Sequence, residues 1–114
     1  EQMTRMLMAV AFAVAPVLAA NLTDDAPIAH FKGKDQSMFD TALHAALDDG
    51  KPGATVAWSN PETKAGGEIK NVKSFTRGDA QCRTVRVSNK AEGRTSAANY
   101  NFCKSPNGKW GLVQ

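Results

Sequence analysis

The side chains best suited to chemistry in this sequence are two cysteines, Cys82 and Cys103, and two histidines, His30 and His44. A catalytic cysteine needs a nearby base to form its thiolate, and only the histidines could supply one. A zinc site needs about four ligands at short spacings, and the sequence has no Cys-x-x-Cys or His-x-x-x-His pair. A disulfide between the cysteines is therefore the favoured prediction, ahead of a nucleophile or a metal ligand.

His44 has neighbours that suit acid–base chemistry, because Asp40 and Asp48 each lie four residues away on the polar side of a predicted helix. A histidine flanked by carboxylates can act as a general base or join a metal site. The alternative is a solvated helix face on which each charge pair contributes roughly 0.2–0.5 kcal/mol. No nucleophile or further ligand accompanies His44 in the sequence. We therefore predict that the chain is not an enzyme and has no metal site or cofactor.

Residues 1–20 have the layout of a secretory signal peptide. A single positive charge precedes an apolar run over residues 6–14, and Ala19 and Ala20 mark the expected cleavage site. A retained membrane anchor is the alternative reading. That run is shorter than the roughly 20 apolar residues of a membrane span, and Pro16 interrupts it.

Export would carry the chain to a compartment in which disulfides persist. We therefore predict an exported protein that is periplasmic or associated with the outer membrane. Residues 1–2 precede the expected initiator, Met3. After the signal peptide, residues 21–35 show no periodicity and are predicted to be a flexible, exposed lead-in, while residues 36–114 form a single domain.

One helix is predicted within SMFDTALHAALDDG. Ser37 and Asp40 have the spacing of a capping box at its start. Gly50 supplies a C-terminal cap, and Pro52 prevents the helix from continuing. Apolar residues at helical spacing, which predict a face packed on a sheet, are Phe39, Ala42, Leu43, Ala46 and Leu47.

The disulfide can be tested against the hairpin that surrounds it. QCRTVRVSN and SAANYNFC have the pattern of strands, and KAEGRT between them has the pattern of a turn. If Cys82 faces Cys103 in an antiparallel pair, the register places Val85 opposite Tyr100, and apolar residues meet on one face. A topology other than a hairpin stays open, because connectivity does not fix strand order.

Three further segments extend the sheet: ATVAWSN, EIKNVKSFTR and KWGLV. The apolar residues of the second segment break strict alternation, which predicts a bulge near Asn71. The predicted fold is α+β, with one N-terminal helix packed on a four- to five-stranded antiparallel meander sheet with one disulfide. Its predicted core residues are Trp58, Phe75, Val85, Tyr100 and Trp110.

The charge is distributed unevenly along the chain. Residues 21–62 carry three lysines and seven acidic residues, whereas residues 63–114 carry ten basic and three acidic residues. A basic sheet invites an anionic partner, such as lipopolysaccharide phosphates, anionic lipid headgroups, cell-wall polymers or acidic proteins, and is compatible with peripheral membrane association. The alternative is a surface that only confers solubility. Nucleic acid is not an expected partner, because Tyr100 and Phe102 are assigned to the core side. The predicted contact residues are Lys70, Lys73, Arg83 and Arg86.

The order of motifs resembles the C-terminal domain of the bacterial outer-membrane surface antigen family, named after a rickettsial antigen. A Trp-x-Asn-Pro element, a Gly-x-x-Cys-Arg element and a final Cys followed by a turn and Trp carry the resemblance over residues 36–113. Gly78 lies one residue further from Cys82 than that spacing would place it. The chain lacks the lipid-attachment cysteine and the glycine-rich hydrophobic segment of many members, so direct anchoring in the outer membrane does not follow. The matching residues are Trp58, Asn60, Pro61, Gly78, Cys82, Arg83, Cys103, Gly108 and Trp110.

The resemblance implies no catalytic residues. The expected function is that of a non-catalytic exported envelope protein, a surface-antigen-like module that binds envelope or protein partners. The alternative is a secreted periplasmic inhibitor or immunity-type protein that blocks a hydrolase, which should present rigid anchors on a loop. A small-ligand carrier would need an internal cavity, for which a core of this size leaves little room.

Overall fold

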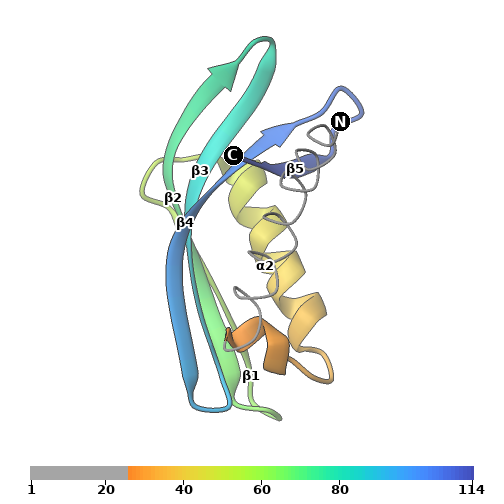
Figure 1. Cartoon of the computed structure of the whole chain (residues 1–114), viewed down its shortest axis with the longest axis vertical. Helices are drawn as coiled ribbons and strands as arrows, with labels where there is room; N and C mark the ends of the chain where they lie inside the picture. Colours follow the sequence, from red (N-terminus) through yellow and green to blue (C-terminus); the bar gives the residue numbers. More distant parts are fainter. Residues whose placement is uncertain (1–25) are drawn as a thin grey trace, which may run out of the picture.

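A computed structural model describes residues 26–114, so the predicted signal peptide over residues 1–20 lies outside the described residues. The described chain forms a short 3-10 helix, one α-helix and one antiparallel sheet with strand order β1-β2-β3-β4-β5. The sheet curls around the α-helix as a half-barrel (Figure 1), which confirms the predicted α+β meander. The elements are η1 (Pro27–His30), α2 (Asp35–Asp49), β1 (Thr55–Asn60), β2 (Ala65–Arg77), β3 (Ala80–Ala91), β4 (Arg94–Lys104) and β5 (Trp110–Val113).

The core lies between α2 and the concave side of the sheet, which we call the inner face. Ile69 and Val85 are fully buried in it, and Leu47 of α2 packs in the same cluster. Burial of each such side chain stabilises the fold by roughly 1.5–3 kcal/mol. We call the opposite side of the sheet the outer face; neither described helix, η1 or α2, lies against it (Figure 1).

Helix α2 begins at Asp35, two residues before the predicted cap, so the predicted capping box is wrong. The Ser37 hydroxyl donates instead to the carbonyl oxygen of Lys34, at 3.1 Å. The Asp35 carboxylate accepts the backbone N–H of Lys32 at 3.0 Å and fixes the first turn. At the other end Gly50 adopts φ 67°, so the predicted glycine cap is confirmed.

The predicted flexible lead-in is wrong for the described residues 26–35. Pro27 in η1 is buried, and the Phe31 ring lies 5.9 Å from the Phe39 ring and 5.2 Å from the Trp58 ring, between centroids. The segment is too short to show a period in the sequence. Its proline and aromatic side chains nevertheless find apolar partners in the core.

The predicted hairpin register is confirmed. Cys82 pairs with Cys103 and Val85 with Tyr100 across β3 and β4. The disulfide joins the two cysteines, whose Cα atoms are 4.0 Å apart. The hairpin and the disulfide therefore support each other, as the sequence indicated.

The predicted bulge is also confirmed, since the β2–β3 register shifts between Asn71 and Lys73. The extra residue reverses which later side chains of β2 face inward. Phe75 pairs with Cys82 and so lies on the outer face, half-buried, rather than in the predicted core. Tyr100 faces inward but is 39% exposed, so it too is wrong as a core residue. Trp58 is buried as predicted, and Trp110 packs half-buried against the core.

Candidate binding surface

Lys70 and Arg86 lie directly opposite each other on β2 and β3. Both side chains are exposed on the outer face, because the neighbouring pair, Ile69 and Val87, points toward α2. Like charges placed opposite each other in a sheet destabilise it. The structure brings these two predicted contact residues together, and the next pair on the outer face, Glu68 and Ser88, adds one exposed carboxylate beside them.

The third predicted contact residue, Lys73, continues this basic row along β2. Its Nζ atom lies 5.9 Å from the centre of the Phe75 ring, and the guanidinium carbon of Arg77 lies 6.0 Å from the same centre. The two cations thus flank one aromatic ring. The row therefore extends toward the turn of the β2–β3 hairpin.

Sequence reasoning missed two cations of this surface, Arg77 and Lys90. Lys90 follows Arg86 by four residues on the same strand and therefore faces the same way. The predicted register contained this signal, because residues of even number on β3 share the outer face. We define the basic outer face as Lys70, Lys73, Arg77, Arg86 and Lys90, and within residues 26–114 none of them forms an ion pair.

Arg83 does not belong to this surface, so its prediction as a contact residue is wrong. Only 8% of the residue is exposed. Its Nε donates to the carbonyl oxygen of Leu47 at 2.8 Å, and its Nη1 donates to the Ser74 hydroxyl at 2.8 Å. Placed opposite Phe102 on the inner face, its positive charge instead meets the C-terminal end of α2, which carries a partial negative charge.

His44 has no catalytic arrangement around it in the described part of the chain. Its Nδ1 atom lies 2.9 Å from the backbone carbonyl oxygen of Asp40, and the Asp40 carboxylate accepts a hydrogen bond from Gln36. The other flanking carboxylate, Asp48, accepts the indole N–H of Trp110 at 3.1 Å. Among residues 26–114 no cluster of three or more His, Cys, Asp and Glu side chains could hold a metal.

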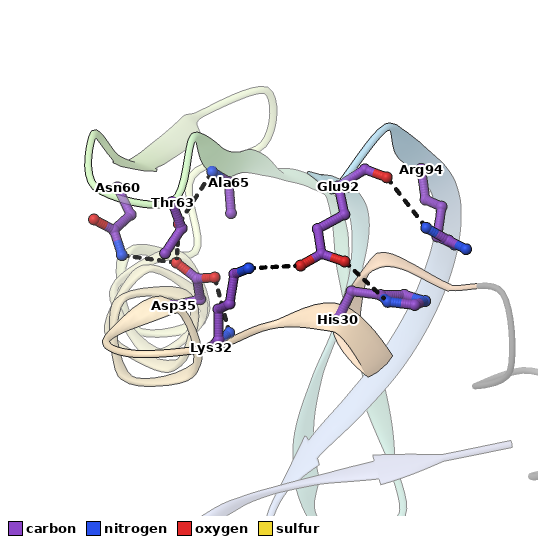
Figure 2. Close-up of polar contacts among 8 residues, drawn as sticks. All are labelled: His30, Lys32, Asp35, Asn60, Thr63, Ala65, Glu92 and Arg94. Atoms are coloured by element: carbon purple, nitrogen blue, oxygen red, sulfur yellow. Dashed lines mark hydrogen bonds and ion pairs between the residues drawn. The ribbon is translucent and has the colours of Figure 1, made fainter.

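Asp35 is the buried carboxylate of a polar cluster where η1, the start of α2 and two sheet turns meet (Figure 2). Its Oδ1 accepts Thr63 Oγ1 at 2.6 Å and Asn60 Nδ2 at 2.7 Å. Burial alone would raise the pKa of Asp35. The hydrogen bonds from Thr63, the Lys32 backbone and Asn60 together outweigh that effect and hold the pKa below its usual value.

Glu92 is the other carboxylate drawn in Figure 2, and it lies in the turn between β3 and β4. It accepts Lys32 Nζ at 2.8 Å and lies 3.4 Å from His30 Nδ1. The hydrogen bond and charge of Lys32 lower the pKa of Glu92, and those of Glu92 raise the pKa of Lys32. These contacts link the start of the described chain to the turn between β3 and β4. We therefore assign His30, Lys32 and Glu92 a structural role.

An apolar groove opens on the inner face beside α2, with a volume of about 340 Å³. Tyr100 is 39% exposed there, and Leu112 is 62% exposed. The sequence placed Tyr100 in the core and so gave no sign of this groove. We define the apolar groove by Phe39 and Leu43 of α2 and by Val87, Tyr100, Phe102 and Leu112 of the sheet.

The geometry defines a small, disulfide-stapled α+β domain with one charged and one apolar surface. In the described range, 26–114, no helix has both the length and the apolar character needed to cross a membrane. The family described as 17 kDa outer membrane surface antigen matches residues 45–111, and the chain belongs to that family. No curated protein and no solved structure matches the chain.

Proposed function

We propose that this chain is a non-catalytic, exported envelope protein whose basic outer face binds anionic groups of the cell envelope. The observation that carries the proposal is the cross-strand pair of Lys70 and Arg86, two exposed cations placed opposite each other. The next pair on the outer face includes the exposed carboxylate of Glu68, which forms no ion pair with either cation within residues 26–114. Family membership and the disulfide support an exported envelope location, periplasmic or at the outer membrane.

Vesicle co-sedimentation tests this proposal. Vesicles of phosphatidylglycerol and phosphatidylethanolamine should bind the chain at low salt, vesicles of phosphatidylcholine should not, and binding should fall as salt rises. Lys70→Glu combined with Lys73→Glu should weaken binding by about tenfold or more, since each cation near an anionic surface contributes roughly 1 kcal/mol.

The matched control is Lys51→Glu combined with Lys109→Glu. It makes the same change in net charge at exposed loop positions outside the basic outer face. Equal loss in both double variants would show a response to net charge alone and would contradict a defined surface. Absence of binding to phosphatidylglycerol vesicles and to lipopolysaccharide at low salt would contradict the proposal as a whole.

One observation favours a second candidate, an inhibitor that blocks a periplasmic hydrolase. The β2–β3 hairpin projects beyond the end of α2 (Figure 1), and the Phe75 ring near its tip is flanked by Lys73 and Arg77. A projecting hairpin with an aromatic anchor suits insertion into a cleft. One-to-one capture of a single hydrolase, lost on Phe75→Ala, would favour this candidate over the envelope module.

A further inference from the structure

Within residues 26–114, strand β4 is paired along only part of the edge that faces away from β3. It pairs with β3 over Arg94–Cys103, whereas β5 covers only Asn101–Lys104. Figure 1 shows β5 beside one half of β4, while the half nearer the β3–β4 turn forms the margin of the sheet. A sheet margin of this kind is a template for another strand.

The backbone groups that point outward from this margin can be assigned. The turn between β3 and β4 has two residues, Glu92 and Gly93, so the closing pair of Ala91 and Arg94 is of the hydrogen-bonded kind. Pairs then alternate along the ladder. This alternation makes Cys82 and Cys103 a pair without hydrogen bonds. Their Cα separation of 4.0 Å agrees with that assignment, because such pairs lie closer together than hydrogen-bonded pairs.

It follows that Thr95, Ala97 and Asn99 aim their N–H and C=O groups away from β3. Within residues 26–114 no hydrogen bond reaches those backbone groups. We call this stretch the open edge. Proteins usually block such an edge with charged residues or proline, and Thr95–Asn99 contains neither.

The two sides of the open edge have opposite characters. On the inner side lies the apolar groove, to which Ser96 and Tyr100 contribute. Three of the four large hydrophobic residues exposed in the described chain, Ile28, Tyr100 and Leu112, line that groove. Apolar side chains of an added strand would cover them, since alternate residues of a strand point to one face.

On the outer side lie Arg86 and Lys90, opposite Asn99 and Thr95. Arg86 Nη1 donates to Asn99 Oδ1 at 3.2 Å, so its guanidinium already extends across β4 toward the open edge. A strand added beside β4 would lie about 10 Å from β3, a distance that long acidic and basic side chains can bridge. The outer side chains of that strand should therefore be acidic.

We propose that the open edge of β4 binds an extended segment of another protein in which acidic and apolar residues alternate. The segment adds a strand to the sheet, with its apolar side chains in the apolar groove and its acidic side chains beside Arg86 and Lys90. The inference deepens the proposed function, and rests on it, by naming one partner of a non-catalytic binding module.

The probe is the synthetic peptide EVEVEVE with blocked ends, added to the isotopically labelled full chain. The controls are KVKVKVK, which keeps the apolar pattern with opposite charge, and EEEEVVV, which keeps the composition without alternation. In the free chain the amides of Thr95, Ala97 and Asn99 should exchange with solvent quickly, and those of Ser96 and Ala98 slowly. EVEVEVE alone should slow exchange at the first three amides.

Ala97→Pro removes an outward N–H from a pair that carries no hydrogen bond to β3, so the hairpin should survive. It should weaken EVEVEVE binding by about tenfold or more, whereas Ala97→Ser should not. Arg86→Glu combined with Lys90→Glu should reverse the preference between EVEVEVE and KVKVKVK. If Ala97→Pro proves unfolded by circular dichroism, this charge reversal still decides the proposal.

Several results would overturn the inference. Slow exchange at the three amides in the free monomer would mean that residues 1–25 fill the edge. Protection that grows with protein concentration would assign the edge to a second copy of the chain. Equal binding of all three peptides would reject the inference, and so would the absence of binding by any of them. Ala97→Pro should leave vesicle binding unchanged, and Lys70→Glu with Lys73→Glu should leave peptide binding unchanged, so each proposal can fail separately.

Discussion

Arg83 of β3 donates a hydrogen bond from its Nε to the carbonyl oxygen of Leu47 in the last turn of α2, at 2.8 Å. Other residues that carry the family resemblance also link the sheet region to the helix. Asn60 donates to Asp35 at the start of α2, and Trp110 donates to Asp48 near its end. These residues therefore determine how α2 lies in the half-barrel, and the surfaces proposed for binding lie elsewhere.

Arg83→Met should destabilise the fold by about 2–4 kcal/mol, because the Leu47 carbonyl and the Ser74 hydroxyl lose their shared donor inside the protein. Urea unfolding measures the change. The matched control is Arg86→Met, an exposed residue of the same strand, which should change stability by only about 0.5 kcal/mol or less. Equal losses in the two variants would contradict the structural role of Arg83.

Replacing both Cys82 and Cys103 with serine should destabilise the chain by about 2–4 kcal/mol, because the bridge closes a loop with a sequence separation of 21. Urea unfolding of the variant, compared with the wild-type chain with and without dithiothreitol, measures the loss. Reduced wild-type protein should approach the stability of the variant. Free thiols at both positions in protein taken from the envelope would contradict the disulfide.

The Asp35 and Glu92 carboxylates should make the fold sensitive to acid. Their pKa values are lowered in the folded chain, so their contribution is present above the unfolded values, near 3.8 and 4.5, and is lost as the pH falls through the lower folded values. Asp35→Asn should therefore be less stable than the wild-type chain at pH 7, with a difference that shrinks below about pH 4. Urea unfolding midpoints of the two chains, measured across pH, test this expectation. A stability difference that stays constant with pH would contradict it.

Lys32 should produce the opposite dependence at high pH. Its pKa is raised by the hydrogen bond and charge of Glu92, so its stabilising contribution is present below the unfolded value of 10.5 and is lost as the pH rises through the folded value. Lys32→Met should remove this loss. Lys34→Met, an exposed neighbour of Lys32, is the control and should retain the wild-type alkaline profile.

Gly67→Ala should prevent stable folding or cost more than about 3 kcal/mol, because a Cβ atom there would overlap the Ser88 carbonyl oxygen and the Asn89 side chain. The close approach lets the Trp58 indole reach Asn89 Oδ1 at 3.1 Å. Gly111→Ala is the control, since no atom lies within 4 Å of its Cβ position. Thermal unfolding compares them, and a Gly67→Ala chain as stable as the control would show that the strands can separate locally.

Local patterns were enough for the register and the bulge. Cys82 and Cys103 fixed one alignment of the hairpin, and alternation around it agreed, so the β3–β4 pairs follow from the sequence. The position of the bulge near Asn71 followed from broken alternation. Its effect on Phe75 did not, because the direction of a side chain after a bulge depends on how the partner strand pairs.

The residues of the candidate surface were predictable only in part. Lys70, Lys73 and Arg86 followed from charge and strand pattern, whereas Arg83 has the same charge and lies on the same strand as Arg86. Alternation along β3 already places Arg83 and Arg86 on opposite faces. The tertiary structure adds the reason why a charged side chain is tolerated on the inner face: the last turn of α2 supplies the Leu47 carbonyl oxygen that accepts the Arg83 hydrogen bond.

The sequence by itself determined the class of fold, the disulfide, the glycine cap of the helix and the basic character of the sheet, because each rests on residues close together or on one simple pairing. The tertiary structure alone decided that Asp35 is a buried anchor, that Pro27 is buried and Phe31 packs against the core, and that within residues 26–114 part of β4 is left unpaired while an apolar groove opens beside it. Those features arise where separate elements meet, and burial and hydrogen bonding between distant residues set them.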